Sequence, residues 1–304
     1  MKRLLVCGSN GLVGQRLALL FGHTTDYEVL HTSHHRNFNL DRGFFDYTQL
    51  DITVRSDVKS LVTSYRPDII INTAAISSVD ECERQRENAW RVNVNGVENL
   101  TDAARLIGAK MIHLSTDYVF DGKYGPYTEI DRVNPINYYG KTKLAGENVI
   151  LSGGVPFAIL RVILVYGGGV ALKKNFATWV IEALRRGESI NCAVDQVANP
   201  TYVGSVGSAV LSVIERDGRG VFHICDSERL SRYDFAMRIA EAFGLDRELI
   251  HKIQSSGLNQ AAPRPLSTGF LVDKARNEVG FEPGNVRNGL EALRRDLHIE
   301  TMNE

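Results

Sequence analysis

The segment NPINYYGKTKLAGEN, residues 134–148, brings two tyrosines and two lysines close together in the chain. Tyr139 and Lys143 are four residues apart, so a helix would place them on one face. Tyr138 and Lys141 are three residues apart and would also be neighbours on a helix. A phenol, whose pKa is about 10, can protonate a ketone oxygen near neutral pH when an ammonium group lowers that pKa. The spacing is compatible with such chemistry or with a solvated helix face, and it leaves open which pair would act.

Short apolar segments alternate with helical patterns in the first half of the chain. We expect strands at 3–7, 27–31, 47–52, 67–72, 110–115 and 157–163, and helices at 12–22, 54–65, 86–107 and 138–151. The alternation predicts an α/β fold, a Rossmann-like, doubly wound parallel sheet with helices on both faces. After residue 166 we expect helices near 174–186, 204–215 and 231–243 and a strand at 220–225. The dinucleotide-binding domain is therefore placed at 1–165 and a smaller, mainly substrate-binding region at 166–304, with some segments returning to the sheet.

Three glycines lie where the first expected strand turns into the first helix. In GSNGLVG, Gly8 permits a tight turn, Gly11 lets the backbone approach a pyrophosphate, and Gly14 allows the helix to pack on the strand. The start of the helix adds free N–H groups and a positive dipole. A glycine-rich turn that binds nothing is the alternative, but the strand-turn-helix context favours a cofactor site. The residues expected to contact the cofactor in this loop are Gly8, Asn10, Gly11, Leu12, Val13 and Gly14.

The second expected strand ends in VLHTSHHRN, residues 29–37, which contains no Asp or Glu. A carboxylate at this point would receive the ribose 2′-OH of NAD, whereas a 2′-phosphate requires a cation. Ser33, His34 and Arg36 could receive that phosphate, so the segment favours NADPH and leaves NADH as the alternative. Four further residues are expected along the cofactor. They are Asp51 and Ile52 at the end of the third strand, beside the adenine, and Ala74 and Ala75 after the fourth, where small side chains let the cofactor pass.

Composition narrows the class of partner. The chain has 304 residues, 43% of them hydrophobic, and a formal net charge of −1, so nothing attracts it to nucleic acid or to an anionic membrane. No stretch of about 18 apolar residues predicts a membrane span. The four cysteines show no zinc-site spacing, and we expect reduced thiols in the cytoplasm. A small-molecule substrate and a metal-free site follow from these features.

Six motifs in this order resemble the extended short-chain dehydrogenase/reductases and, more narrowly, the dTDP-4-dehydrorhamnose reductase family. They are GxxGxxG at 8, NTAA at 72, LSTDYVFDG at 114, YGKTKLAGE at 139, DQVANPT at 195 and RPLST at 264. The family's YxxxK pair falls on Tyr139 and Lys143, and Thr116 matches the hydroxyl member of its catalytic triad. The resemblance implies NADPH-dependent reduction of the 4-keto group of a deoxy-sugar nucleotide, most specifically of dTDP-4-dehydrorhamnose to dTDP-rhamnose for surface polysaccharide.

The chemistry of a ketone reduction agrees with this choice. We expect Lys143 to lower the pKa of Tyr139, and both residues to contact the nicotinamide ribose as well. Thr116, at the end of the fifth strand, would hold the carbonyl oxygen. On the substrate side the resemblance implies contacts from Asp117, Tyr118, Val119, Asn175, Gln196 and Arg264. Trp90 and Trp179 lie among helical apolar residues and are expected in the core.

Two alternatives remain at this point. A nucleotide-sugar epimerase shares the fold, the cofactor loop and YxxxK, whereas a dehydratase is disfavoured because Tyr118 stands where that chemistry needs an acid. The β subunit of methionine adenosyltransferase resembles the same family and binds NADP without catalysis, so a regulatory subunit is the second alternative. Some family members carry magnesium at a subunit contact, and a homodimer is compatible with the sequence.

Overall fold

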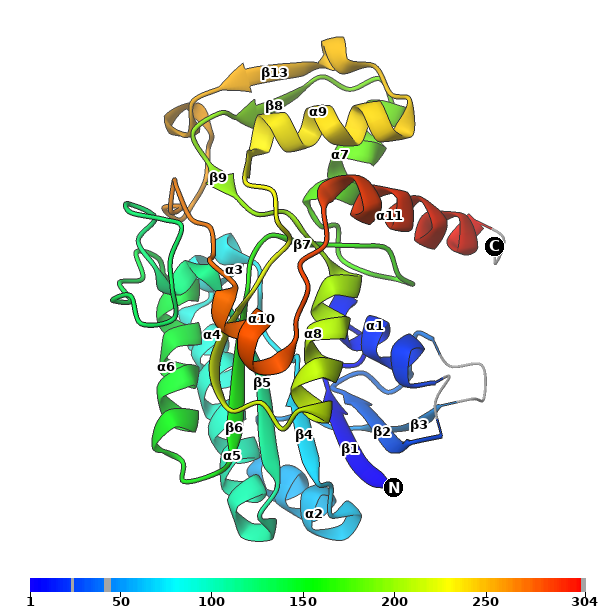
Figure 1. Cartoon of the computed structure of the whole chain (residues 1–304), viewed down its shortest axis with the longest axis vertical. Helices are drawn as coiled ribbons and strands as arrows, with labels where there is room; N and C mark the ends of the chain where they lie inside the picture. Colours follow the sequence, from blue (N-terminus) through cyan, green and yellow to red (C-terminus); the bar gives the residue numbers. More distant parts are fainter. Residues whose placement is uncertain (23–24, 41–44, 302–304) are drawn as a thin grey trace.

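The computed structural model describes residues 1–22, 25–40 and 45–301. Its centre is a parallel seven-stranded sheet with the order β11-β6-β5-β4-β1-β2-β3 (Figure 1). The strands are β1 Lys2–Cys7, β2 Tyr27–Ser33, β3 Asp46–Gln49, β4 Ile69–Asn72, β5 Lys110–Thr116, β6 Phe157–Val162 and β11 Gly220–Ile224. The strand order reverses direction between β1 and β4, which is where doubly wound sheets bind their ligands. The predicted Rossmann-like α/β fold is confirmed.

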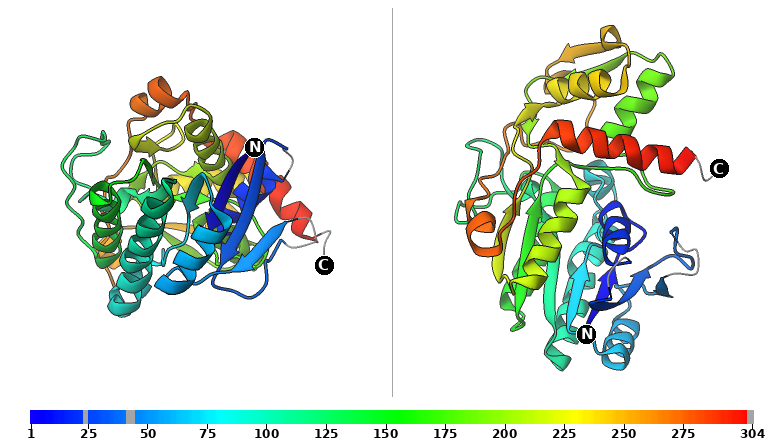
Figure 2. Two further views of the ribbon diagram at one scale, coloured as in Figure 1. Left: turned by 90° about the horizontal axis from the view of Figure 1, so that it is seen from below. Right: turned by 45° about the vertical axis from the view of Figure 1, so that its right-hand side comes forward.

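Helices cover both faces of the sheet, as the view from below shows (Figure 2). On one face α1 (Leu12–Phe21), α8 (Val203–Glu215) and α10 (Asp273–Val279) bury residues such as Leu17, Val206 and Ala275 against Leu4 and Val6. The other face is covered by α2 (Arg55–Tyr65), α5 (Gly96–Ile107) and α6 (Tyr138–Ser152). Alternate residues of each central strand point to opposite faces, so both sides of the strands are apolar.

A second lobe caps the carboxyl ends of the strands (Figure 1). It contains α7 (Phe176–Arg185), α9 (Arg232–Phe243) and α11 (Val286–Thr301), with the parallel pair β8 (Ile190–Ala193) and β13 (Ile250–Ile253). Its own core gathers Tyr166, Val180, Phe235 and Leu290. Four short segments, in two pairs, connect it to the sheet domain. They are β7 (Val165–Tyr166) with β10 (Thr201–Tyr202), and β9 (Val197–Ala198) with β12 (Leu230–Ser231).

Several segments differ from the expectations. The helix expected at 86–107 is α4 (Arg86–Trp90), a π-helical turn at Arg91–Asn95, and then α5, while α3 (Val79–Arg84) precedes it unpredicted. The strand β3 ends at Gln49, so Asp51 and Ile52 lie beyond it. Trp90 and Trp179 are 42% and 36% exposed, so the expectation that they belong to the core is wrong. Helical spacing marks a face but does not show whether another element covers it. After residue 166, β11 returns to the central sheet beside β6, and the boundary at 165/166 remains a prediction.

None of the helices within the described residues is long and apolar enough to cross a membrane. All four cysteines are free thiols and buried.

Candidate active site

The start of α6 sets the position of Tyr139. Asn137 caps the helix by accepting a hydrogen bond from Gly140 N at 2.9 Å, which fixes the first turn. Gly140 faces the backbone of Tyr118, and a Cβ at this position would collide with the Tyr118 carbonyl oxygen. Only glycine therefore lets the helix approach the end of β5 this closely. Tyr139 is brought beside Tyr118, with the two rings 5.8 Å apart at 72°.

Thr116 ends β5 and faces the same site. Its hydroxyl hydrogen bonds to Tyr139, which lowers the pKa of that phenol, but burial is the larger effect and raises the pKa above its usual value. Lys143 is not among the groups that act on this pKa, and its Nζ donates to the Leu114 carbonyl; the lowering of the Tyr139 pKa by Lys143 stays a prediction. Thr116 Oγ1 also donates to Asp117 Oδ1 at 3.2 Å.

Lys143 lies one turn after Tyr139 on α6 and is 2% exposed. Its Nζ donates to the Leu114 carbonyl at 2.7 Å and lies 3.2 Å from His113 Nε2. Burial lowers the pKa of Lys143 to about 8, while Glu147 and the Cys82 thiol act in the opposite direction.

His113 lies between Lys143 and Asn72. Asn72 Oδ1 accepts from Ala74 N at 3.0 Å, and its Nδ2 lies 3.2 Å from His113 Nδ1. Burial and the positive charge of Lys143 hold the pKa of His113 well below its usual value, so the ring is neutral.

A buried ion pair supports the same face of α6. Glu147 is fully buried and pairs with Arg161 of β6, whose Nη2 lies 2.7 Å from Oε2. Ser115 donates to Glu147 Oε1 at 2.5 Å. The contacts among Glu147, Arg161 and Ser115 therefore hold β5, β6 and α6 together next to Thr116. Sequence reasoning missed it, although Glu147 stands four residues after Lys143 on the same helical face.

The first strand-to-helix turn has the shape that a pyrophosphate requires. Gly8 has φ 87°, and a Cβ there would lie 2.6 Å from Ala74 N, while a Cβ on Gly14 would collide with the Gly8 carbonyl. Gly11 caps α1 without any side-chain hydrogen bond, which leaves the N–H groups of Leu12 and Val13 available to an anion. The residues of this loop therefore fit a dinucleotide.

Asn10 organises the segment that follows β2. Its Nδ2 donates to Ser33 Oγ at 3.0 Å and to the Asn37 carbonyl at 2.9 Å, and its Oδ1 accepts from Asn39 N at 2.8 Å. Ser33 Oγ is also 2.8 Å from Tyr47 OH. The Ser33 hydroxyl is thus hydrogen bonded to other residues of the loop and stabilises the shape of that loop.

The other residues expected along the cofactor lie around this segment. His34 and Arg36 are exposed, and burial together with neighbouring cations lowers the pKa of His34. Asp51 is exposed, whereas Ile52 is 5% exposed and packs against Gly96. Ala74 and Ala75 follow β4 and are partly exposed beside the glycine loop. The exposed cation nearest to the end of β2 in sequence is Arg36.

The residues expected to contact the substrate differ in whether their side chains are free to bind it. Val119 is fully buried in an apolar cluster with Phe120 and Tyr127, so the expectation that its side chain lines the pocket is wrong. Asn175 caps α7, with Oδ1 accepting from Thr178 N at 3.2 Å and Nδ2 donating to Gly167 O at 2.7 Å. The structure therefore gives Asn175 a structural function.

Two more of these residues have protein partners. Gln196 Nε2 donates to Gln260 Oε1 at 3.0 Å. Arg264 forms an ion pair of 2.8 Å with Asp80. Asp117 remains next to Thr116, and burial raises its pKa to about 6, although a hydrogen bond from Thr268 and the charge of Arg232 oppose the rise.

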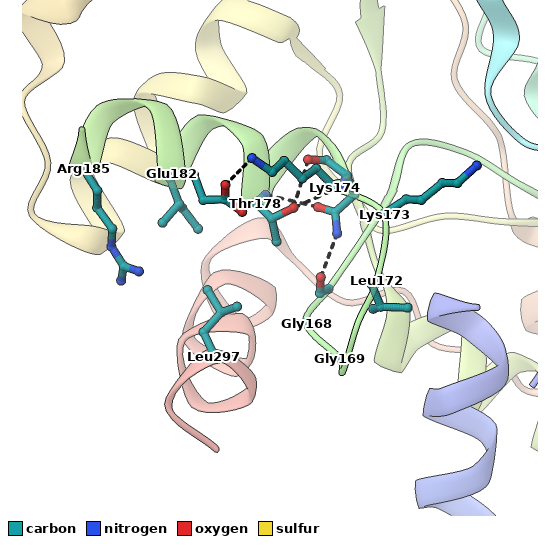
Figure 3. Close-up of a pocket in the computed structure, with 12 residues that line it drawn as sticks. Gly168, Gly169, Leu172, Lys173, Lys174, Thr178, Glu182, Arg185 and Leu297 are labelled. Atoms are coloured by element: carbon teal, nitrogen blue, oxygen red, sulfur yellow. Dashed lines mark hydrogen bonds and ion pairs between the residues drawn. The ribbon is translucent and has the colours of Figure 1, made fainter. Parts of the chain in front are cut away.

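A hollow of about 190 Å³ lies between the glycine-rich segment 167–169, α7 and α11 (Figure 3). Lys173, Lys174, Arg185 and Leu297 are among its lining residues, and Lys174 is paired with Glu182. Thr116, Tyr139 and Lys143 do not line it. The described residues also contain no group of three or more His, Cys, Asp or Glu side chains arranged to hold a metal.

The comparisons with known proteins agree with this geometry. The family model described as the RmlD substrate binding domain matches residues 1–299. A dTDP-4-dehydrorhamnose reductase of Aggregatibacter actinomycetemcomitans is 31% identical over 97% of this chain and 99% of its own length. The crystal structure of dTDP-4-dehydrorhamnose reductase from Bacillus anthracis in complex with NADP has a TM-score of 0.86 and 28% identity, covering 97% of this chain and 99% of that one. A methionine adenosyltransferase 2 subunit beta of Xenopus tropicalis is 34% identical over 87% of this chain and 78% of its own length.

The fold, the family model and the named relatives define an NAD(P)H-dependent oxidoreductase of the short-chain dehydrogenase/reductase class. Within it, the chain belongs to the dTDP-4-dehydrorhamnose reductase family, as its motifs predicted. The similarity to the adenosyltransferase subunit covers less of both chains and does not favour the regulatory alternative.

Proposed function

We propose that this protein reduces the 4-keto group of a deoxy-sugar nucleotide with NADPH, and that its substrate is dTDP-4-dehydrorhamnose and its product dTDP-rhamnose. The observation that carries the proposal is the position of Thr116 at the carboxyl end of β5, facing Tyr139 in the first turn of α6. The family and the names of its members supply the substrate.

The residues divide the work of a ketone reduction. NADPH supplies the hydride. Tyr139 gives the proton to the keto oxygen, and its phenol is protonated at neutral pH. Thr116 donates a hydrogen bond to the same oxygen as negative charge develops. Lys143 orients the cofactor ribose, and with a pKa of about 8 it can return a proton to Tyr139 near neutral pH.

The segment after β2 determines the preference for NADPH over NADH in this proposal. Because no carboxylate follows β2 and Arg36 is exposed there, the site suits a 2′-phosphate better than a free ribose hydroxyl. On the substrate side we assign the sugar to Asp117 and Tyr118, and contacts from Asn175, Gln196 and Arg264 require that these side chains exchange their protein partners. The reducing cytoplasm suits the four free cysteines, and a homodimer remains a prediction.

The test is an assay of NADPH oxidation over a panel of dTDP-, UDP- and GDP-linked 4-keto sugars, with analysis of the products. Oxidation with the dTDP-linked substrate and formation of dTDP-rhamnose would support the proposal. A change of sugar configuration without net NADPH oxidation would identify an epimerase instead. Absence of both, together with co-purification of a methionine adenosyltransferase, would identify a regulatory subunit.

A further inference from the structure

Arg232 reaches from the second lobe toward the catalytic candidates. It is the first residue of α9, and its guanidinium carbon lies 5.4 Å from the ring centroid of Phe176, the first residue of α7. Its charge acts on Asp117 and Tyr118, since it opposes the rise in pKa that burial causes in both. Arg232 therefore lies between the end of β5 and the start of two helices. Sequence reasoning missed it because no motif contains it.

One end of this guanidinium has no partner. Arg232 Nη1 is buried, and no acceptor among the described residues hydrogen bonds to it. A buried charged donor left unsatisfied is costly, so such a group requires an explanation. Phe176 holds the guanidinium plane but offers no oxygen. Another part of the guanidinium hydrogen bonds to the Tyr118 side chain, so Nη1 is the atom left for an acceptor from outside the chain.

The other cations near the substrate side do not share this property. Arg264 is paired with Asp80, Lys173 with Glu81, and Lys174 with Glu182. Arg264 was expected to contact the substrate, but its charge is paired with Asp80. Asp117 does not neutralise Arg232 in the same way, because no ion pair joins them and its carboxylate receives hydrogen bonds from Thr116 and Thr268.

The surroundings favour an anion as the partner. Arg232 begins α9, and Phe176 begins α7, so the positive ends of two helix dipoles lie beside the guanidinium. The unpartnered Nη1 of Arg232 can donate a charge-assisted hydrogen bond to a phosphate oxygen. A neutral sugar hydroxyl would gain no electrostatic stabilisation from the two helix dipoles or from the guanidinium charge.

We propose that Arg232 binds the diphosphate of the sugar nucleotide through the free edge of its guanidinium. The inference rests on the proposed function for the identity of the ligand. It assigns Arg232, rather than Arg264, as the principal cation for the substrate phosphates. The sugar would then lie between this residue and Tyr139, over Asp117 and Tyr118.

The experiment is titration calorimetry of the full chain with dTDP, which carries the diphosphate without the sugar, and with thymidine, which carries neither. Arg232→Met should weaken dTDP binding by about tenfold or more, which is the usual loss for a charge-assisted phosphate contact. Arg232→Lys should restore part of it, and thymidine binding should not change. Arg238→Met, an exposed arginine of the same helix, is the matched control and should bind dTDP as the wild type does. NADPH affinity should be equal in all four proteins.

Three outcomes would overturn the proposal. One is unchanged dTDP binding in Arg232→Met, even if turnover of the sugar nucleotide fell, since Arg232 would then act on the sugar. Another is equal weakening of thymidine and dTDP, which would indicate a damaged pocket. The third is wild-type protein that binds NADPH but not dTDP. A different result would contradict the proposed function alone: dTDP binding that depends on Arg232, but no NADPH oxidation by the protein with any 4-keto-sugar nucleotide.

Discussion

His113 Nε2 lies 3.2 Å from Lys143 Nζ, with Asn72 on the other side of the imidazole. Asn72 Oδ1 accepts a hydrogen bond from Ala74 N, which fixes the side chain on that side. Burial and the charge of Lys143 keep the imidazole neutral, so it offers the lysine no negative charge. Burial therefore lowers the pKa of Lys143 to about 8, and Glu147 and Cys82 oppose it only in part.

Replacing His113 with a carboxylate should reverse this effect. With a pKa of about 8, Lys143 should lose its proton as the pH rises through that value, and kcat/KM for reduction should fall with it. In His113→Glu the carboxylate can accept from both Asn72 and Lys143, so the pKa of Lys143 should rise and the alkaline limb should move up by about one pH unit or more. The pH profile of NADPH-dependent reduction measures this shift. An unchanged limb, with NADPH binding intact, would show that Lys143 does not control it.

The two adjacent tyrosines should behave differently. Tyr139→Phe removes the acid beside Thr116 and keeps the ring, so kcat should fall by about 10²- to 10⁴-fold with little change in KM. Tyr138 lies under Arg86, 5.1 Å from its guanidinium, and Tyr138→Phe should leave kcat within about tenfold. Steady-state kinetics of both variants decides the question. Loss of activity at Tyr138 with full activity at Tyr139 would reverse the assignment.

Arg36 should determine part of the cofactor preference. If it holds the 2′-phosphate, Arg36→Ala should lower kcat/KM with NADPH by about tenfold and leave kcat/KM with NADH unchanged, because only NADPH carries that phosphate. Comparing the two cofactors in wild type and variant measures this. Wild-type preference for NADH would contradict the assignment.

The buried pair of Glu147 and Arg161 should be important for stability. Glu147→Gln leaves the Arg161 charge buried and only partly satisfied, so the free energy of unfolding should fall by about 3 to 5 kcal/mol. Glu98→Gln, an exposed glutamate of α5, is the control and should change it by less than about 0.5 kcal/mol. Denaturant titration gives both values. Equal stability of the two variants would mean that the pair is not needed to hold α6 against the sheet.

Metal independence can be tested directly. Hydride transfer with Tyr139 as acid needs no Lewis acid, so activity should survive EDTA. Activity that EDTA removes and Mg²⁺ restores would reveal an ion that the sequence did not predict.

Patterns in the sequence predicted those features of the structure that depend only on residues close together in the chain. Gly8, Gly11 and Gly14 predicted the phosphate loop, because a tight turn requires glycine at particular positions whatever the rest of the fold. The spacing of Tyr139 and Lys143 needed only a helix. Arg232 could not be found in this way, since its importance depends on two helices and a strand end that meet only in the fold. Val119 and Trp179 were misplaced for the same reason, because burial depends on what covers a face.

The contact between Gly140 and the carbonyl oxygen of Tyr118 has a consequence for engineering. The close contact of α6 is made with a main-chain atom of residue 118, so an exchange of aromatic side chains there leaves this contact of the helix in place. Libraries at position 118 should therefore alter which sugars are accepted while the proton donor keeps its place. Position 140, inside α6, offers no such freedom, so substrate selectivity can be altered at residue 118 of the turn after β5 while Gly140 is kept.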